Sequence, residues 1–480
     1  MPNPRLGLSL TVYGGAGEIG GNKILLTCGE TRLFLDFGLS FSAKRRFFGT
    51  FLQPHRYSLV RDYVLTGVLP GIRGIYRRDL LHHAAELDDN EPAVDAVVVS
   101  HAHLDHCGHV SLLRHDIPIL LGEGARTIIA AREMSRNSSS IETSILHTGK
   151  SSARVVKTFK TGDVVRVREM RLEPIHVDHS VPAAYGIIAE TTDGVVAYSG
   201  DFRIHGPMRS MTRDFIERCV DKGVDTLIIE GTRLDEYEEH SEDNVREALT
   251  GHISSSSGRG VVVLVGLLDF DRLRSLLAAC EQTGRALIIS LRHAFLLKQL
   301  AEAGLRIDVP KLEHDRLMVY HERRGSGAFS DSDYRGWLSK FIQQLMDAGA
   351  PLVRDEEIAR SPEKYVLALS QPEDITELAN IKPPTGSRFI LSTSEPHNEE
   401  QMLEMEKIRN WVDFMGMSFH HVHASGHASG GEIINVIEEI NPRKIIPIHT
   451  EQPGLFAKLL RERGLGTMVH EPRPGETIKI

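Results

Sequence analysis

Residues 100–109, SHAHLDHCGH, place four histidines and one aspartate directly after the apolar run AVDAVVVS. A continuous apolar run of this length is typical of a strand buried on both faces, so the polar cluster follows a strand end. In an extended or turning segment, side chains two residues apart point the same way. His101 and His103 can therefore converge on one cation, while Asp105 and His106 turn toward a second. Imidazole and carboxylate ligands favour zinc, with manganese or iron as the alternatives.

Two cations need more ligands than this stretch holds, and the chain offers them in similar positions. EPIHVDHSVPAAYG contributes His176 and His179, VVAYSGD ends on Asp201, and KIIPIHTE contains His449 after an apolar run. The carboxylate of Asp201 is able to bridge two cations. Four ligand-type residues within six positions, with further ligands at other strand ends, predict a metal site rather than a chance gathering of imidazoles on a loop.

The composition is that of a soluble protein with room for two or three domains: 480 residues, 41% hydrophobic and 25% charged. No apolar run approaches the ~20 residues that cross a bilayer, and the N-terminal residues lack the apolar region of a signal peptide, so we expect no membrane segment. The four cysteines are too few and too scattered for a disulfide framework, which favours a cytoplasmic location. With a net charge of −9, any polyanionic partner must bind a local basic surface.

The pattern of elements changes along the chain. Residues 1–40 read as short strands punctuated by glycines, such as LSLTVYGG and TRLFLDFG. Residues 240–395 alternate helical patterns with buried strands such as RGVVVLVG and RALIIS, as in an α/β unit with a mostly parallel sheet. Residues 396–480 continue with helix, turn and strand in GGEIINVIEEINPRKIIPIHTE. The sequence therefore predicts an α/β protein.

A stretch over residues 44–78 is both basic and aromatic. It holds eight basic residues and one acid, Asp62, so its formal charge is +7. Arginines pair with phosphates and aromatic rings stack on unpaired bases, so the stretch is a candidate for contact with RNA, with Arg77 and Arg78 as the residues to test. The alternative is a structural excursion that packs its aromatic side chains onto the domain.

The motifs together resemble a known family. HxHxDH, the histidine of HSVPA and the aspartate of SGD are similar to the metallo-β-lactamase fold, and more narrowly to the β-CASP nucleases of the RNase J-like type. The glycine-rich GGAGEIGGNKILL, the LFLDFG strand, LIIEGT, HASGHAS and PIHTE match further motifs of that family, so the resemblance covers nearly the whole chain. It implies a metallo-β-lactamase αββα sandwich with an inserted β-CASP α/β domain. The expected domains are 1–210, an insert over 211–395, and a return segment over 396–480.

The resemblance also implies roles for individual residues. One zinc ion would be held by His101, His103 and His179, a second by Asp105, His106 and His449, and Asp201 would bridge them. Catalytic residues beside Asp105 would be Asp36, Glu230 and His427, which lie just outside the ligands. His109 and His176 match no ligand of the family, and we expect them to orient other residues or to lie on the surface.

The implied mechanism is hydrolysis by a metal-activated hydroxide. Two zinc ions about 3.5–4 Å apart acidify a water and clamp the attacking and leaving oxygens of a phosphate. His427 is the candidate proton donor to the leaving oxygen, the alternative being that it only orients a zinc ligand. Backbone groups of its turn, at Ser425, Gly426 and Ser429, could hold a phosphate.

His449 favours RNA, because DNA-acting members of the family carry an aliphatic residue at that motif. The chain departs from the family in having Thr450 between His449 and Glu451, and VLVGLLDFDRLR lacks the Ser-Asn-His run that relatives use near a terminal phosphate. The sequence thus predicts a ribonuclease on single-stranded RNA, with 5′→3′ exonucleolytic and endonucleolytic action both open. The alternatives are a DNA nuclease and a non-nucleolytic hydrolase or RNA-binding protein. The resemblance also implies a homodimer or larger homo-oligomer.

Overall fold

A computed structural model describes residues 7–49, 51–135, 141–146, 154–236, 240–305, 307–394 and 399–480. The chain forms two compact units. Unit 1 comprises Met1–Glu133, Ser138–Glu238 and Gly426–Ile480, and unit 2 comprises Met134–Asn137 and Glu239–Ser425. None of the described helices has the length and apolar composition that crossing a membrane requires.

Unit 1 contains two seven-stranded sheets, and the first has the order β21-β1-β2-β3-β4-β5-β6. Its strands are β1 Ser9–Gly14, β2 Lys23–Cys28, β3 Thr31–Phe37, β4 Ala96–Val99, β5 Ile119–Gly122, β6 Val156–Phe159 and β21 Thr477–Lys479. Pairing is antiparallel from β21 to β3 and parallel from β3 to β6. The run AVVV of β4 is wholly buried, as expected for a strand covered on both faces.

The second sheet has the order β20-β19-β11-β10-β9-β8-β7. Its strands are β7 Val165–Val167, β8 Met170–Val177, β9 Ala184–Glu190, β10 Val195–Tyr198, β11 Thr226–Glu230, β19 Lys444–Ile448 and β20 Met468–Val469. Alternate residues of one strand serve opposite layers: Ile187 faces a core shared with Leu26 and Val98 of the first sheet, while Ile188 faces Phe215 and Ile433 of the outer helices. The two sheets therefore pack face to face.

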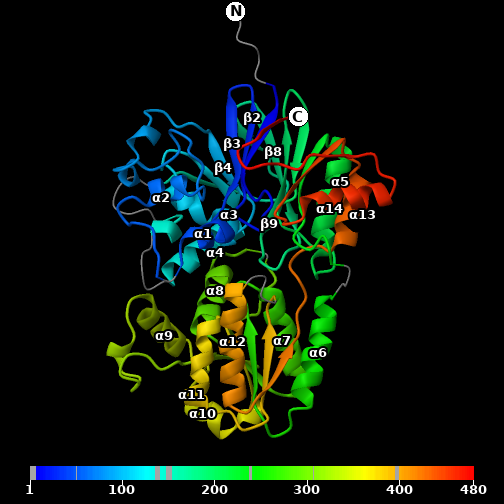
Figure 1. Cartoon of the computed structure of the whole chain (residues 1–480). Coiled ribbons are helices and arrows are strands. Elements are labelled where there is room, and N and C mark those ends of the chain that lie inside the picture. Colours follow the sequence, from blue (N-terminus) through cyan, green and yellow to red (C-terminus); the bar gives the residue numbers. More distant parts are fainter. Residues whose placement is uncertain are drawn as a thin grey trace, which may run out of the picture. The chain divides into compact units, whose positions relative to one another are not determined.

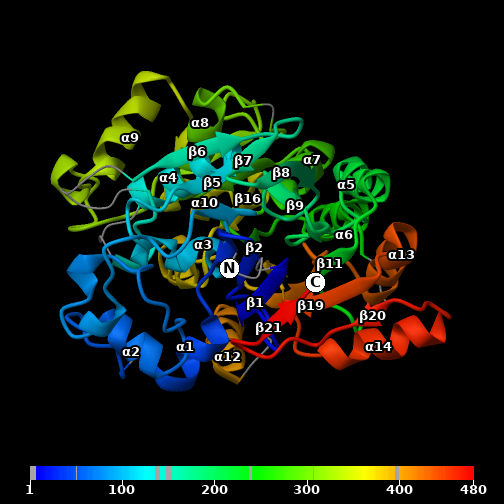
Figure 2. The same ribbon diagram turned by 90° about the horizontal axis from the view of Figure 1, so that it is seen from above.

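Helices cover the outer faces of this pair of sheets. They are α1 Phe41–Phe47, α2 Leu59–Leu65, α3 Leu104–Cys107, α4 Glu123–Met134, α5 Arg209–Lys222, α13 Gly430–Ile440 and α14 Pro453–Glu462. In Figure 1, α1 to α4 lie beside the first sheet, and α5, α13 and α14 lie beside the second. The view from above shows the same order of layers (Figure 2). Unit 1 is the expected αββα sandwich.

Unit 2 is built on one parallel sheet of order β15-β14-β13-β16-β12-β17-β18. Its strands are β12 Val261–Val265, β13 Ala286–Ile289, β14 Leu317–Tyr320, β15 Leu352–Val353, β16 Tyr365–Leu369, β17 Arg388–Ser392 and β18 Ser418–His421. Its helices are α6 Glu242–Ser254, α7 Phe270–Thr283, α8 Leu291–Glu302, α9 Trp337–Asp347, α10 Asp355–Arg360, α11 Leu378–Ile381 and α12 Glu399–Phe414. The predicted α/β insert is thus present.

Two boundaries lie elsewhere than expected. The first unit continues past residue 210, because β11 pairs in parallel with both β10 and β19 of its second sheet. The insert continues past residue 395, because β18 pairs with β17 at the edge of the parallel sheet. The chain passes between the units near residues 238 and 425. The expected boundaries at 210 and 395 each fell about one helix and one strand too early.

Candidate metal centre

The predicted ligands and their partners follow the carboxyl ends of strands in unit 1. β10, β11 and β19 are parallel neighbours, so their carboxyl ends meet at one edge of the second sheet. Asp201 follows β10, Glu230 is the last residue of β11, and His449 follows β19 directly. His101 follows β4 of the first sheet, and His179 follows β8. Strand ends, rather than one continuous motif, therefore assemble the site.

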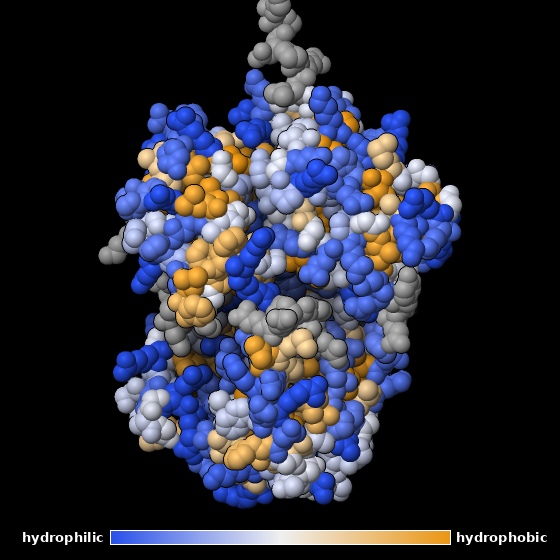
Figure 3. All heavy atoms as spheres, in the orientation of Figure 1, coloured by the Kyte–Doolittle hydropathy of each residue, from blue (hydrophilic) through white to orange (hydrophobic). Residues whose placement is uncertain are grey.

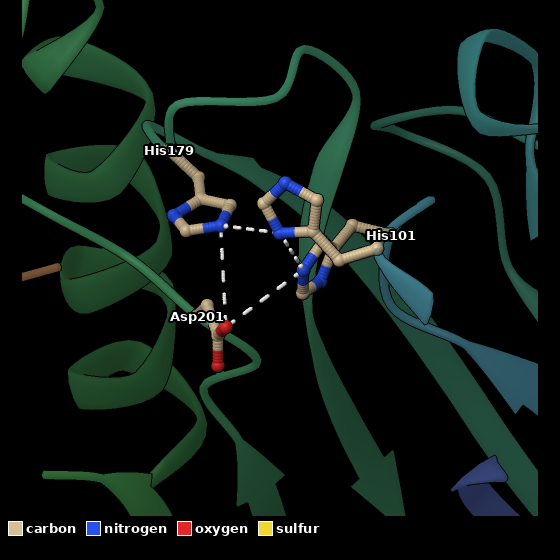
Figure 4. Close-up of side chains that lie close together, drawn as sticks. His101, His179 and Asp201 are labelled. Carbon is tan, nitrogen blue, oxygen red and sulfur yellow. Dashed lines mark hydrogen bonds and ion pairs between the residues drawn. The ribbon is translucent and has the colours of Figure 1, made fainter. Parts of the chain in front are cut away.

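A first group of ligand atoms brings together His101, His103, His179 and Asp201. Nδ1 of His103 lies 3.1 Å from Nε2 of His101 and 3.2 Å from Nε2 of His179. Oδ2 of Asp201 lies 3.7 Å from Nε2 of His101 and 3.9 Å from Nε2 of His179. In Figure 4, His101, His179 and Asp201 point toward a common centre.

A second group brings together Asp105, His106 and His449, and Asp201 reaches it as well. Nε2 of His449 lies 3.2 Å from Oδ2 of Asp105, and Nε2 of His106 lies 3.8 Å from that oxygen. Oδ2 of Asp201 lies 3.0 Å from Nε2 of His106 and 3.6 Å from Nε2 of His449. One carboxylate oxygen thus faces both groups, which is the position that a bridging ligand requires.

Asp36 orients the histidines from behind. It is fully buried, and its backbone has the left-handed φ of 59° that residues other than glycine rarely adopt. Its Oδ2 lies 2.7 Å from Nδ1 of His106. The backbone N–H and the hydroxyl of Ser100 donate to the same carboxylate at 2.7 and 2.8 Å, and the hydroxyl of Tyr198 donates at 2.5 Å. The Ser100 hydroxyl also lies 3.0 Å from Nδ1 of His101. These contacts to Nδ1 direct the Nε2 atoms of both rings at the cluster.

Thr232 and Gly426 orient the other two rings. Nδ1 of His179 donates to the carbonyl of Gly426 at 2.6 Å. The Thr232 hydroxyl lies 2.8 Å from Nδ1 of His449 and donates to Oε2 of Glu230 at 2.7 Å. Again Nδ1 is engaged by a second partner and Nε2 faces the ligand atoms. The arrangement matches the second partner that metal-bound histidines nearly always have.

His427 is outside the second group but forms a third group of neighbouring ligand atoms with Asp201 and His449. Its Nδ1 lies 3.1 Å from Oε1 of Glu230, 3.1 Å from the Thr232 hydroxyl and 4.0 Å from Oδ2 of Asp201. The ring stacks on His449 with centroids 5.5 Å apart, and 20% of the His427 side chain is exposed. Burial lowers the pKa of His427, but the carboxylates of Glu230 and Asp201 outweigh it and raise that pKa to about 9. His427 can therefore hold a proton at neutral pH.

The donor set fits a cation. Burial lowers the pKa of His103 to about 4 and that of His101 well below its usual value, so both rings are neutral at pH 7. Burial raises the pKa of Asp201, but His106 and His449 outweigh it and hold that carboxylate ionised. Among the described residues, Nε2 of His106 and Oδ1 of Asp201 are buried without a hydrogen bond.

Burial lowers the pKa of His106, but three neighbouring carboxylates outweigh it and raise that pKa well above its usual value; they are those of Asp201, Asp105 and Asp36. This ring must therefore lose a proton when a metal binds. Ionised carboxylates, the neutral rings of His101 and His103, and buried atoms without a hydrogen bond otherwise suit a cation.

Other predicted residues lie outside the cluster. His176 stacks on Tyr185, with centroids 4.1 Å apart, and contacts the Thr161 hydroxyl at 3.0 Å. His109 is buried against Tyr63, with centroids 5.6 Å apart. Neither belongs to a group of ligand atoms among the described residues.

The predicted RNA contacts have partners within the protein. Arg77 pairs with Asp79 at 2.5 Å, and Arg78 pairs with Asp88 at 3.0 Å. The N–H of Ser429, which caps α13, donates to Glu432 at 2.9 Å. The Gly426 carbonyl binds a ligand histidine, as described above, and Ser425 is half-buried where the chain leaves unit 2.

The sequence interpretation missed Ser100, Tyr198 and Thr232. All three stand next to a motif that it used: Ser100 precedes His101, Tyr198 lies in VVAYSGD, and Thr232 is two residues after Glu230. A hydroxyl side chain beside a strand-end ligand was the available signal. Hydroxyls are common at strand ends, so only the fold shows that these three contact the ligands.

The chain is similar in sequence or in fold to several known proteins. Residues 63–264 match the Beta-lactamase superfamily domain, and residues 415–470 match the Zn-dependent metallo-hydrolase RNA specificity domain. Ribonuclease J of Sinorhizobium meliloti is 25% identical over 448 residues, covering 89% of this chain and 70% of that protein. Ribonuclease J of Mycolicibacterium smegmatis is 24% identical over 461 residues, covering 92% and 69%. A solved protein of unknown function from Enterococcus faecalis V583 has a TM-score of 0.73 at 20% identity, over 98% of this chain and 100% of its own, a likeness of fold.

Proposed function

Because the chain belongs to the RNase J-like metal-dependent hydrolases of the metallo-β-lactamase superfamily, we propose that it is a zinc-dependent ribonuclease. Its reaction is hydrolysis of phosphodiester bonds in single-stranded RNA. The observation that carries the proposal is the pair of ligand groups that share the carboxylate of Asp201. Two cation positions at one carboxylate are the arrangement of two-metal phosphodiester hydrolysis.

The ligand atoms divide between two zinc ions. His101, His103 and His179 would hold one ion, Asp105, His106 and His449 the other, and Asp201 both. When bound, two zinc ions supply Lewis acidity toward a phosphodiester and make hydroxide available near neutral pH. Manganese is the alternative metal for the same donors.

His427 gives the proton to the leaving oxygen. Its Nδ1 edge is held by Glu230 and Thr232, so the ring presents Nε2 to the substrate. General-acid catalysis contributes about 10²–10⁴-fold, and a good leaving group does not need it. We expect His427→Gln to lose RNA cleavage to this extent while retaining hydrolysis of bis(p-nitrophenyl) phosphate and its metal content. If both substrates slow in parallel, His427 only orients its neighbours.

A single set of substrates tests the function and its mode. End-labelled RNAs of one sequence with a 5′-triphosphate, monophosphate or hydroxyl, together with the matching single-stranded DNA, are incubated with the zinc-loaded protein. Mononucleotides from the 5′ end indicate 5′→3′ exonucleolytic action, and intermediate fragments independent of the 5′ group indicate endonucleolytic action. Cleavage of DNA faster than RNA would favour the DNA nuclease, and no cleavage of any RNA would refute the proposal.

Two further expectations belong to this proposal. A cytoplasmic ribonuclease agrees with four free, buried cysteines. The family resemblance favours a homodimer or larger homo-oligomer, which sedimentation of the purified protein tests.

A further inference from the structure

The basic stretch divides into two parts that differ in how their arginines are paired. In the later part, each of three arginines forms an ion pair with a nearby carboxylate: Arg73 with Asp89 at 3.1 Å, Arg77 with Asp79 at 2.5 Å, and Arg78 with Asp88 at 3.0 Å. The three acidic partners lie in the sequence just after the stretch, so this part is close to neutral as folded. Phosphates would have to displace these carboxylates to bind there.

The earlier part, taken with the start of α1 as residues 41–49 and 51–65, keeps the charge of its arginines, although Lys44 pairs with Glu142 at 2.9 Å. Within the described residues, none of its four arginines contacts a carboxylate; they are Arg45, Arg46, Arg56 and Arg61. Arg45 donates to the Phe41 carbonyl at 3.1 Å, and the Arg46 guanidinium lies over the Phe47 ring at 5.6 Å. The acid of this part, Asp62, accepts from the His55 N–H at 2.7 Å and from the Ser58 hydroxyl, so its charge is used locally.

Aromatic rings are exposed among these arginines. Phe51 is 93% exposed and Tyr57 is 62% exposed. These values are too high for aromatic side chains packed onto the domain. The rings of His55, Tyr57 and His83 form a row with successive centroids 5.2 Å apart. In the orientation of Figure 1, Figure 3 shows apolar surface over α1 and α2. Exposed rings beside unpaired arginines are the combination that binds unpaired bases and their phosphates.

Tyr63 fixes this part to the body of unit 1. It is fully buried, its hydroxyl donates to Glu142 at 2.6 Å, and its ring packs against Phe48 and His109 with centroids 5.5 and 5.6 Å away. The Lys44 ammonium lies over the same ring at 5.6 Å. The exposed rings and arginines therefore stand on an anchored element, which lowers the entropic cost of binding.

The segment also starts at the metal centre. Gly38 packs so closely on the chain that a Cβ there would lie 1.6 Å from the Asp105 carbonyl oxygen. The N–H of Leu39 donates to the Leu104 carbonyl at 2.9 Å, and α1 begins at Phe41. A single RNA strand bound along this segment would therefore have one end close to Asp105 and the other ligands.

We propose that residues 41–49 and 51–65 form a contact surface for single-stranded RNA, which rests on the proposed ribonuclease function. The guanidinium groups of Arg45, Arg46, Arg56 and Arg61 contact phosphates, and Phe51 and Tyr57 stack on bases. The exposed apolar side chains alone would suit a protein partner, but four arginines without carboxylate partners favour a polyanion. The contact surface therefore lies in the earlier part of the basic stretch and not at Arg77 and Arg78.

The test is the salt dependence of binding of the zinc-loaded protein to a labelled 2′-O-methyl oligouridine, which is checked on a gel to be intact after each measurement. One variant carries glutamine at the four arginines of the surface. The control variant carries glutamine at four exposed basic residues on or near α14, which removes the same charge: Arg443, Lys458, Arg461 and Arg463. Each single-strand phosphate contact adds about 0.7 to the slope of log affinity against log salt, so we expect the slope to fall by about 2–3 in the first variant and little in the control.

A double variant, Phe51→Ala with Tyr57→Ala, tests stacking separately. It changes no charge, so we expect at least about a fivefold loss of affinity with an unchanged salt slope. Equal slopes for wild type, first variant and control, in a wild-type protein that cleaves RNA, would overturn the proposal. The same holds if the first variant instead shifts the sedimentation of the protein, because the surface would then join copies of the chain. Absence of cleavage by the wild type bears on the ribonuclease function instead.

Discussion

Two buried polar networks, one in each unit, differ in whether they are complete. In unit 2, the guanidinium of Arg272 is fully buried and every one of its nitrogens is engaged. It donates to Glu242 at 2.8 and 3.3 Å, to Ser392 at 2.7 and 2.8 Å, and to the Ala424 carbonyl at 3.1 Å. The hydroxyl of Ser275 adds a donor to Glu242 at 2.9 Å. The guanidinium is thus paired within the network itself.

The network in unit 1 is open, although most of its residues are as deeply buried; its Asp105 side chain is 21% exposed. Nε2 of His106 and Oδ1 of Asp201 have no hydrogen bond among the described residues, although an unpaired buried polar atom costs about 1–3 kcal/mol. Four ligand rings have a partner at Nδ1 and turn Nε2 toward the cluster, whereas the fifth, His103, turns its Nδ1 there; the four are His101, His106, His179 and His449. The two networks share burial and charged side chains, but within the described part of the chain only the one in unit 1 leaves polar atoms that face one point without a hydrogen bond. This incomplete pairing is the feature that favours a metal site there.

The largest expected effect is that of Asp201→Asn. Partners of metal ligands typically change metal affinity by about 10–100-fold when mutated, so weakening the bridging ligand should exceed a hundredfold and abolish RNA cleavage with it. Zinc per chain is measured after dialysis, alongside cleavage of labelled RNA. Full activity at normal metal content would refute the bridging assignment.

The matching change in the closed network is Arg272→Met. Breaking a buried ion pair leaves Glu242 uncompensated, so we expect a loss of about 3–5 kcal/mol in the free energy of unfolding. Its neighbour Arg274 is 23% exposed and pairs with Asp308, which is 67% exposed, so Arg274→Met should cost about 1 kcal/mol. Denaturant unfolding measures both. Zinc content of the folded Arg272 variant should stay normal; its loss would mean that the two networks are not independent.

Lys23 is a buried ammonium that forms no ion pair with a carboxylate among the described residues, so it shows the effect of burial on a single charge. Its side chain is 1% exposed, its ammonium donates to the Gly21 carbonyl at 3.2 Å, and burial lowers the pKa of Lys23 to about 8. Between pH ~8 and ~10.4 the unfolded chain binds this proton and the folded chain does not, so stability rises with pH in that window. The full rise is about 3 kcal/mol at 1.36 kcal/mol per pKa unit.

Lys23→Met should remove that rise and stabilise the protein at pH 7 by up to the same amount. Denaturant melts of wild type and variant from pH 7 to pH 10 give the difference directly. A constant difference across this range would show that Lys23 is charged in the folded protein throughout.

The smallest expected effect is that of Thr232→Val, which keeps the shape of the side chain and removes the hydroxyl between Glu230 and Nδ1 of His449. Loss of a partner behind a ligand should lower zinc affinity by about tenfold, at the lower end for such changes. Thr11→Val, also in unit 1, removes a buried hydroxyl that lies 2.8 Å from the Thr477 hydroxyl where β1 pairs with β21. Competition with a zinc indicator dye compares the two. Equal zinc affinities of the two variants would show that the Thr232 hydroxyl does not position His449.

Features of the fold that depend on residues close together in the sequence could be predicted, and features that depend on distant residues could not. The ligands could be found because each follows a recognisable strand, and strand ends meet in a sheet sandwich. The boundaries at 210 and 395 fell too early because VDTLIIE suits either sheet equally, and only its pairing with β10 and β19 assigns it. The ion pairs of Arg77 and Arg78 could not be anticipated because the stretch was closed at residue 78, just before the acids that pair with them.

The two ligand groups are proposed to hold zinc for the hydrolysis of RNA. Titration of zinc into the chelator-stripped protein, with metal binding and cleavage of labelled single-stranded RNA followed in the same samples, tests this proposal most directly. We predict that cleavage is absent without metal and rises with zinc until two ions per chain are bound. Saturation of the site without cleavage of RNA, or full cleavage by the metal-free protein, would contradict the account.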